Sequence, residues 1–392
     1  MKTNLAVIFG CRSVEHEVAI ISAVQAMRAV DKNKYDIIPL YVTKSGELYT
    51  GDALTKIEEF RNMNTLLSKL SPVSLVRQDG NVYMKYLGGS LFKKKDVLID
   101  VAFPIVHGTN CEDGTVAGYL EFLGLPYVGC DILSAAVGMD KAVFKDVLKS
   151  AGLPVLPCLR FSAREYNEDG KTIIKNINEK IGYPVIVKPV NLGSSVGITK
   201  AHDEAGLIDA ITRAISFSDK VLVEHAVNNL REINCSVHGD SDECQASVCE
   251  EPFMNDELLS YEDNYLGGGK SKGMASLGRK LPADIPEDAA KAIRELSCKI
   301  FKTLGCNGVV RIDYLVDNDT GKVYANEINT IPGSLSFYLW EATGLNYTDM
   351  IDKLVALAFR RQRNRDNLTF TIDTNILSGV SFGSKGAKGS KI

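Results

Sequence analysis

No apolar run in this 392-residue sequence is long enough to cross a membrane. Its apolar runs, such as those at residues 5–9 and 101–106, are far shorter than the ~20 residues that a spanning helix needs. The first of these runs is also too short for the core of a secretory signal peptide. We therefore expect a cytoplasmic protein with no membrane partner.

An excess of positive charge is missing too, since the formal net charge is -4 and the sequence pI is near 5.9. A protein that binds nucleic acid through its phosphates normally presents a basic surface, so we expect no nucleic-acid partner. The hydrophobic share of 45% and the charged share of 24% are ordinary for a globular protein and exclude a wholly disordered chain. At about 150 residues per domain, the length predicts two or three domains.

The nine cysteines include no CxxC pair, and none of their spacings is typical of a zinc site. Scattered cysteines in a chain of this length are typical of reduced, mostly buried thiols in a cytosolic protein. A disulfide framework is therefore not expected.

The first part of the chain alternates strands and helices. Strands are predicted at residues 5–9, 37–42 and 96–106, and helices at 15–30 and 115–123. This βαβ order predicts a parallel sheet covered by helices. The fold class is therefore α/β, with a Rossmann-like parallel-sheet domain expected at residues 1–130.

Two further units follow. The second, at residues 131–225, has predicted helices at 141–150 and 204–215, strands at 185–188, 198–201 and 221–224, and a glycine-serine loop at 193–197. The third, at 226–377, is α+β: predicted strands at 232–238 and 245–249 pair with each other, a glycine-rich loop spans 261–280, helices span 288–304 and 349–365, and a hairpin joins 308–316 to 322–329. Residues 378–392 are rich in Gly, Ser and Lys, which predicts a disordered tail.

Charged residues alternate along both strands of that hairpin. Arg311 and Asp313 share one strand face, as do Glu327 and Asn329. If the turn centres near Thr320, Asp313 lies opposite Glu327 and Arg311 opposite Asn329. Facing carboxylates repel, and Mg²⁺ relieves this because it prefers oxygen ligands and completes its shell from substrate phosphates. The alternatives are a solvated strand face, or Arg311 alone neutralising one carboxylate.

A lysine and a glycine-serine loop follow each other in the second unit. Lys188 ends a predicted strand, and the loop at 193–197 includes Ser194, Ser195 and Gly197. Backbone N–H groups of such a loop can wrap a phosphate, and the lysine adds positive charge. The order is not that of a P-loop, because a strand follows. The alternative is a plain turn between strands.

Four further residues lie beside predicted strand ends. Glu224 and Glu232 could hold an adenine amine or ribose hydroxyls, and the alternative is two surface glutamates. Glu15 and His107 follow strands of the first sheet, where α/β sheets bind ligands. The alternatives are helix capping for Glu15 and a structural role for His107.

Taken together, these residues resemble the D-alanine–D-alanine ligase family of ATP-grasp enzymes over residues 5–357. The matching stretches are 13–18 (SVEHEV), 107–108 (HG), 112–115 (EDGT), 139–141 (MDK), 187–189 (VKP), 193–197 (GSSVG), 231–232 (RE), 311–313 (RID) and 327–333 (EINTIPG). These separate motifs occur in the same order as in the family, so chance is a poor explanation of the resemblance. The resemblance implies a three-domain fold with ATP between the central and C-terminal ATP-grasp subdomains.

The resemblance also implies roles for the nucleotide and metal residues. Those implied for ATP are Lys141 and Lys188 at the phosphates, Ser194, Ser195 and Gly197 as a lid over them, Glu224 at the adenine and Glu232 at the ribose. Two Mg²⁺ ions, for which Mn²⁺ is a substitute, are implied at Asp313, Glu327 and Asn329.

The residues implied for the first D-alanine and for catalysis form a second group. Glu15 would bind the ammonium group in a hydrogen-bonded set with Ser194 and Tyr265. His107 would lie near the carboxylate of the same substrate. Arg311 would stabilise the transferred phosphate, and the long loop at 261–280 would act as a lid.

The implied reaction joins two D-alanines through an acylphosphate, with ATP as the phosphate donor, for peptidoglycan precursor synthesis in the cytoplasm. A homodimer is expected by the same resemblance. An alternative is a ligase with another acceptor, such as D-serine, D-lactate or another amino acid. A second alternative is a nucleotide-binding protein without ligase activity.

The segment after Gly333 motivates these alternatives. The family usually has a longer Ser/Thr-rich segment there, which holds the second substrate's carboxylate, and here Ser334 or Ser336 is the candidate substitute. Elsewhere, the family commonly has a lysine where Asn264 stands, and Lys270 or Lys272 could supply that charge.

Cys11 and Cys111 stand where the family usually has glycines. A side chain at such a position costs little if φ is negative and more if φ is positive. We interpret both cysteines as tolerated small substitutions near the first-substrate site.

Overall fold

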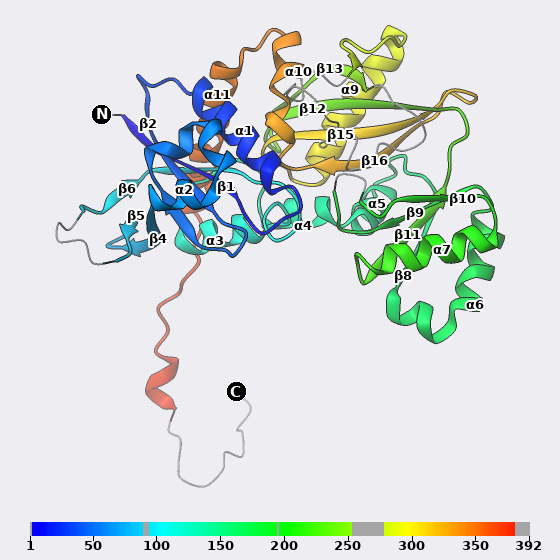
Figure 1. Ribbon diagram of the computed structural model, residues 1–392, viewed down its shortest axis with the longest axis horizontal. Coiled ribbons are helices and arrows are strands. Elements are labelled where there is room, and N and C mark those ends of the chain that lie inside the picture. The colour runs from blue at the N-terminus through cyan, green and yellow to red at the C-terminus, as the bar shows by residue number, and fades with distance from the viewer. Residues whose placement is uncertain (1, 89–93, 194–195, 253–277, 381–392) are drawn as a thin grey trace.

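The computed structural model describes residues 2–88, 94–193, 196–252 and 278–380. Over these ranges the chain forms three β-sheets, one after another along the sequence, with helices packed around them (Figure 1). None of the helices within these ranges is long and apolar enough to span a membrane. The sheets lie within the residue ranges expected for three domains, and the division into domains itself stays a prediction.

The first sheet has seven strands in the order β6-β5-β4-β3-β2-β1-β7. Their bounds are β1 (Thr3–Gly10), β2 (Tyr35–Val42), β3 (Leu48–Thr50), β4 (Ser71–Gln78), β5 (Asn81–Tyr86), β6 (Val97–Ile99) and β7 (Val101–Ile105). Helix α1 (His16–Ala29) connects β1 to β2, and these strands run parallel to each other and to β7, as the βαβ pattern predicts. The other neighbouring strands are antiparallel, so the expected parallel sheet is extended by an antiparallel part that the sequence analysis did not predict.

Two local features distinguish this sheet from the predicted one. Asp79 and Gly80 both have left-handed backbone angles, with φ of 50° and 80°, and together they make a two-residue hairpin turn between β4 and β5. Such a short connection can only join antiparallel strands. The single strand expected at 96–106 is also divided, because Asp100 separates β6 from β7 and accepts a hydrogen bond from the Asn4 backbone N–H at 2.7 Å.

The second sheet has four antiparallel strands in the order β10-β9-β11-β8. These are β8 (Cys158–Ser162), β9 (Val185–Pro189), β10 (Thr199–Ala201) and β11 (Lys220–His225). Helices α6 (Ala163–Lys180) and α7 (Glu204–Ile215) pack on the sheet, and α5 (Lys141–Ser150) precedes it. Helices α5 and α7 begin and end where the sequence predicts them, and Asp140 and Asp203 cap their first turns.

The third sheet has the order β14-β13-β12-β15-β16. Its strands are β12 (Leu230–Gly239), β13 (Cys244–Pro252), β14 (Arg279–Lys280), β15 (Gly308–Asp317) and β16 (Val323–Asn329). The predicted pairing of β12 with β13 is confirmed, as is the β15–β16 hairpin. Helix α9 (Glu287–Thr303) covers β12 and β13, and its Phe301 is fully buried in the core of this part.

The end of the chain returns to its beginning. After the short helical segment η4 (Gly333–Ser336) come α10 (Phe337–Ala342) and α11 (Tyr347–Asp366), and α11 packs against α1 and β7 (Figure 1). One hydrophobic core therefore contains Phe9 of β1, Val24 of α1 and Leu354 of α11. Helices α3 (Thr115–Leu123) and α4 (Ile132–Met139) lead from the first sheet to the second.

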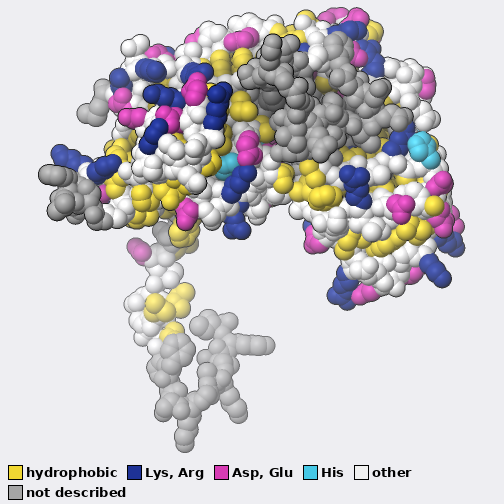
Figure 2. Space-filling view, viewed as in Figure 1, with side chains coloured by type: hydrophobic (Ala, Val, Ile, Leu, Met, Phe, Trp, Pro, Cys, Tyr) yellow, Lys and Arg dark blue, Asp and Glu magenta, His cyan; other side chains and the backbone are white. Residues whose placement is uncertain are grey.

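The surface charge, the C-terminal segment and the cysteines can be compared with the sequence expectations. On the face shown in Figure 2, basic and acidic side chains are interspersed. The expected disordered tail at 378–392 begins inside a short helical turn, η5 (Ile376–Gly379), and residues 381–392 lie outside the described residues. All nine cysteines are free thiols, as expected.

Candidate active site

The β15–β16 hairpin places its charged residues as the sequence predicts. Arg311 pairs with Asn329 in the register and Asp313 with Glu327, and the register shifts only after Asp313. The four side chains are therefore neighbours on one face of the third sheet.

Asp313 is held by two neighbours on this face. Arg311 donates to both of its carboxylate oxygens, each at 2.7 Å, and the Asn329 amide donates to Oδ2 at 3.0 Å. Burial and the nearby charge of Glu327 raise the pKa of Asp313, and Arg311 opposes that shift. In this structure Arg311 therefore neutralises the carboxylate of Asp313, which is one of the alternatives set out above.

Glu327 meets a lysine from the second part of the chain. Lys141, at the start of α5, has its Nζ 3.1 Å from Glu327 Oε2 and donates to the Leu192 carbonyl at 2.7 Å. Burial alone would raise the pKa of Glu327, but the charges of Lys141 and Lys188 outweigh it and lower the pKa. Lys188 Nζ donates to Asn326 Oδ1 at 3.1 Å, so both predicted phosphate-binding lysines reach the same strand.

Glu224 lies in the interior rather than at the surface. It is 1% exposed, and its carboxylate forms ion pairs with Lys188 and with Lys145, whose Nζ lies 2.8 Å from Oε2. Burial would raise the pKa of Glu224, but the two lysines lower it to about 2. The surface-glutamate alternative is wrong for this residue, and its contact with adenine stays a prediction.

Lys145 was not identified from the sequence. It lies one helical turn after Lys141 on the buried face of α5, next to Phe144, and is 1% exposed. A lysine on an otherwise apolar helix face was the available signal, but a helical lysine is far more often at the surface.

Glu232, on β12, increases the negative charge around the hairpin. Burial and the charges of Asp313 and Glu327 raise its pKa to about 7. Within the described residues, no three His, Cys, Asp or Glu side chains are placed to hold a metal ion by themselves. Two carboxylates and the Asn329 amide, with an acidic neighbour, nevertheless fit Mg²⁺ that takes further ligands from phosphates and water.

Glu15 comes close to two glycine backbones. A Cβ placed on Gly108 or on Gly193 would lie 2.8 Å from Glu15 Oε2, so both positions need glycine while the carboxylate lies there. The turn before α1, the loop after β7 and the glycine-serine loop therefore meet at this carboxylate. Gly197 has a φ of 77°, and a Cβ there would be 2.8 Å from the Phe217 ring.

Several predicted site residues fall outside the described residues. They are Ser194, Ser195, Tyr265, Asn264, Lys270 and Lys272, together with most of the loop at 261–280. Their roles in the lid and at the first substrate stay predictions.

His107 links the first sheet to the segment after β16. Its Nδ1 is 2.8 Å from the Ile331 carbonyl, which places the proton on Nδ1, so Nε2 accepts from Ser22 Oγ at 3.0 Å. Burial, together with the charge of nearby Arg311, lowers the pKa of His107 to about 4, although the hydrogen bond to Ile331 opposes this shift. Both ring nitrogens of this neutral imidazole are occupied by protein partners, and its contact with a substrate carboxylate stays a prediction.

Ser22 and Gln25 on α1 were also missed by the sequence analysis. Ser22 Oγ accepts from the Ser334 backbone N–H at 2.9 Å, and Gln25 Oε1 accepts from Ser334 Oγ at 2.6 Å. Both lie on the same face of the helix as Glu15, since they follow it by about two and three turns. Polar residues on the buried face of this helix were the only signal.

Glu112 connects the same two segments. Its Oε2 accepts from the Gly108 N–H at 3.0 Å, and its Oε1 accepts from the Ile331 N–H at 2.9 Å. Burial and the charge of Glu15 raise its pKa to about 7, although the backbone bonds oppose this. Glu112 follows a predicted strand of the first sheet and stands in a stretch that carries the family resemblance, but the sequence alone did not indicate that it connects these two segments.

The η4 segment has an unusual backbone. Ser334, Leu335 and Ser336 are consecutive and left-handed, with φ of 50°, 54° and 51°. Each non-glycine residue in this conformation costs roughly 1–2 kcal/mol, and such strain often occurs at functional sites. The Ser336 hydroxyl is buried and has no hydrogen-bond partner among the described residues.

Cys11 and Cys111 lie in one small buried cluster with Val106. Cys11 has a φ of 77°, so its side chain carries the conformational cost that a glycine would avoid. Cys111 has no positive φ, and its thiol donates to the His107 carbonyl at 3.1 Å. The substitution is therefore inexpensive at Cys111 and costly at Cys11.

Comparisons with known proteins identify the family of the chain. The chain matches the family models described as D-ala D-ala ligase N-terminus, over residues 4–130, and D-ala D-ala ligase C-terminus, over residues 147–356. It is 40% identical over 381 residues to the D-alanine–D-alanine ligase of Acetivibrio thermocellus, with 94% of this chain and 98% of that protein covered. It is 38% identical over 375 residues to the D-alanine–D-alanine ligase of Thermosipho melanesiensis, at 95% and 98% coverage.

Solved structures are similar over nearly the whole chain. The D-alanine-D-alanine ligase from Coxiella burnetii aligns with a TM-score of 0.76 at 29% identity, covering 93% of this chain and 96% of that one. The VanG D-Ala:D-Ser ligase from Enterococcus faecalis aligns with a TM-score of 0.76 at 32% identity, covering 91% and 100%.

Proposed function

Since this chain belongs to the D-alanine–D-alanine ligase family, we propose that it joins two D-alanines to D-alanyl-D-alanine at the expense of ATP, for peptidoglycan precursor synthesis. The observation that carries the proposal is the meeting of Lys141 and Lys188 with the acidic β15–β16 hairpin. This arrangement provides positive charge for phosphates beside oxygen ligands for a cation. We further propose a cytoplasmic homodimer.

The positively charged side chains would act mainly on the phosphates. The carboxylate of the first D-alanine attacks the γ-phosphate of ATP, ADP leaves, and an acylphosphate results. The amine of the second D-alanine then attacks the acyl carbon, loses a proton and displaces inorganic phosphate. Phosphoryl transfer depends on positioning and charge neutralisation, which Lys141, Lys188 and Arg311 can supply. Asp313, Glu327 and Asn329 are the residues that would hold two Mg²⁺ ions, which supply further positive charge to the phosphate oxygens.

The amino-acid substrates would lie between the first sheet and η4. Glu15 would bind the ammonium group of the first D-alanine, where the three loops meet. Glu112 and His107 fix the loop after β7 against Ile331, so they would keep the two substrate-binding segments in register. A closed site is needed because water would hydrolyse the acylphosphate.

An acceptor panel tests the function. ADP release is measured with ATP and Mg²⁺ in the presence of D-alanine alone, or of D-alanine combined with D-serine, D-lactate or L-amino acids. We expect turnover with D-alanine alone and a product with the mass of D-alanyl-D-alanine. Turnover only in the mixed reactions would show that the second substrate is not D-alanine. The short η4 segment favours this alternative. ATP binding without phosphate release in any mixture would support the non-catalytic alternative instead.

The Ser336 hydroxyl tests the acceptor site. Because it is buried without a partner, removing it in Ser336→Ala should leave the protein equally stable. If this hydroxyl binds the carboxylate of the second substrate, the KM for the second D-alanine should rise about tenfold, the value of one hydrogen bond to a charged group. Steady-state kinetics and thermal unfolding measure the two effects. An unchanged KM would show that the acceptor is held elsewhere.

A further inference from the structure

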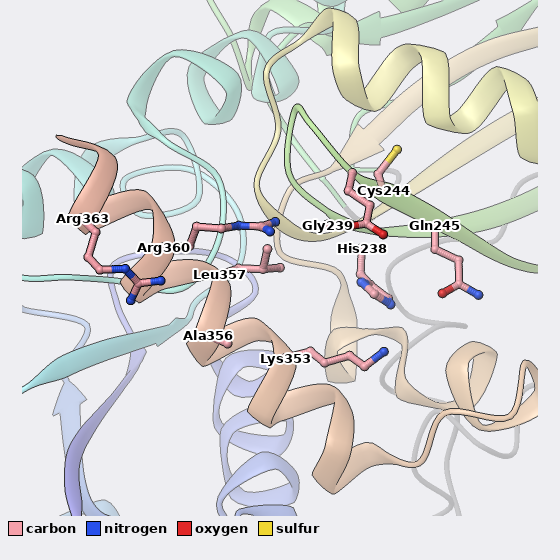
Figure 3. Close-up of a pocket in the computed structure, with 10 residues that line it drawn as sticks. His238, Gly239, Cys244, Gln245, Lys353, Ala356, Leu357, Arg360 and Arg363 are labelled. Atoms are coloured by element: carbon pink, nitrogen blue, oxygen red, sulfur yellow. The ribbon is translucent and has the colours of Figure 1, made fainter. Parts of the chain in front are cut away.

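A cavity of about 410 Å³ lies between the β12–β13 turn and one face of α11, and we call it the α11 pocket (Figure 3). Its main lining residues are His238, Glu243, Lys353, Leu357, Arg360 and Arg363. No lining residue belongs to the candidate active site. We propose that the α11 pocket binds a small organic anion, through a phosphate or carboxylate group, at a site separate from those for ATP and D-alanine.

The pocket has more positive than negative charge. Lys353, Arg360 and Arg363 lie on the same side of α11, because Arg360 and Arg363 follow Lys353 by seven and ten residues, or about two and three helical turns. Asp240 forms an ion pair with Arg360. In the described part of the chain, neither Lys353 nor Arg363 has an ion-pair partner. With Glu243 as the second acid, one positive charge remains in excess.

Buried hydrogen-bonding atoms in the pocket lack partners. Both ring nitrogens of His238 and the Nε of Arg360 are buried without a hydrogen bond to any described residue. The His238 ring cannot easily turn elsewhere, because it packs against the Trp340 ring with centroids 4.4 Å apart. Figure 3 shows His238, Lys353 and Arg360 directed toward the same space. Burial, with the nearby charge of Lys353, lowers the pKa of His238 to about 4, so its neutral ring donates through one nitrogen only. Unmade hydrogen bonds cost free energy, so the site gains by binding a molecule that accepts from this nitrogen and from Arg360 Nε.

The size and lining of the pocket indicate the class of ligand. Its volume lies within the range of about 300–1,000 Å³ for small-molecule sites, and it exceeds what a free phosphate ion needs. Ala356 and Leu357 add an apolar wall between the basic side chains of α11. Guanidinium and ammonium groups are the usual partners of phosphate and carboxylate. The fitting ligand therefore has one anionic group and a small apolar body.

The test measures binding of three probes to the full chain, without nucleotide or D-alanine, by isothermal titration calorimetry. The probes are inorganic phosphate, phenyl phosphate and benzoate; the last two have one anionic group on the same small apolar ring, so that the panel separates phosphate from carboxylate recognition. The variant Lys353→Ala/Arg363→Ala removes charge, and Ala356→Trp fills the pocket without changing charge. The matched control, Lys291→Ala/Lys299→Ala, removes two exposed cations from α9, which does not line the pocket.

We expect saturable binding of at least one probe to the wild-type protein and to the control. Binding should be at least tenfold weaker in both pocket variants, while turnover with ATP and D-alanine stays at the wild-type level. The proposal is overturned if no probe binds the wild-type protein, or if the pocket variants bind like it. It is also overturned if Lys188→Ala removes the binding, since the anion then lies in the ATP site. Because no substrate is present, failure of the ligase activity would leave this result unaffected.

Discussion

Replacing Glu327 by glutamine is expected to reduce turnover on the order of a thousandfold and to leave the fold intact. Glutamine keeps the size of the side chain but has no charge and only one acceptor oxygen, so it is a poor ligand for Mg²⁺. It also gives up the ion pair with Lys141, the lysine expected at the phosphates. Lys141 would keep its bond to the Leu192 carbonyl, so α5 should stay in place.

The measurement is ADP release at saturating D-alanine and Mg²⁺, together with the thermal unfolding midpoint. A matched control is Glu295→Gln, which makes the same chemical change on the exposed face of α9 and should keep full activity. Near-normal turnover in Glu327→Gln would contradict the assignment of this residue to the metal site.

Replacing Glu224 by glutamine is expected to destabilise the protein by about 3–5 kcal/mol. The reason is that Glu224 is the shared partner of Lys145 and Lys188, so its replacement leaves the buried Lys145 without a counter-charge and removes the ion-pair partner of the buried Lys188. Lys145→Met should cost less, because it leaves one lysine paired with one carboxylate. Urea unfolding of both variants measures the difference, and Lys149→Met, an exposed lysine on the same helix, is the control.

The same variant has a defined pH dependence. The pKa of Glu224 is about 2 in the folded protein and 4.5 as its ordinary value, so its contribution is present above pH 4.5 and is lost as the pH falls toward 2. A shift of this size corresponds to about 3 kcal/mol. The stability gap between wild type and Glu224→Gln should therefore narrow as the pH falls below 4.5. A gap that stays constant from pH 6 to pH 3 would show that the lysines do not hold Glu224 ionised.

Local patterns in the sequence were enough to predict the parts of the site that lie close together in the chain. The register of Asp313 opposite Glu327 follows from strand alternation and one turn position. The limits of α5 follow from a capping aspartate and an amphipathic face. The identity of the nucleotide residues came from the family resemblance, since a lysine or glutamate near a strand end is common in any α/β protein.

Contacts between distant segments could not be predicted in this way. Ser22 and Ser334 are 312 residues apart, and nothing in either neighbourhood indicates the other. The burial of Lys145 depends on Glu224, which approaches from another strand. The antiparallel pairing of β4 with β5 depends on the turn at Asp79 and Gly80, a two-residue hairpin signal that the sequence analysis overlooked.

The packing of α11 against α1 and β7 has a consequence for biosynthesis. The apolar surface of the first sheet and of α1 is completed by residues such as Leu354, which the ribosome adds long after α1. Until then the nascent N-terminal part has an uncovered apolar face, and chaperones that recognise such faces have time to bind it. Synthesis of α11, rather than of the first sheet, therefore sets the moment at which that core can close.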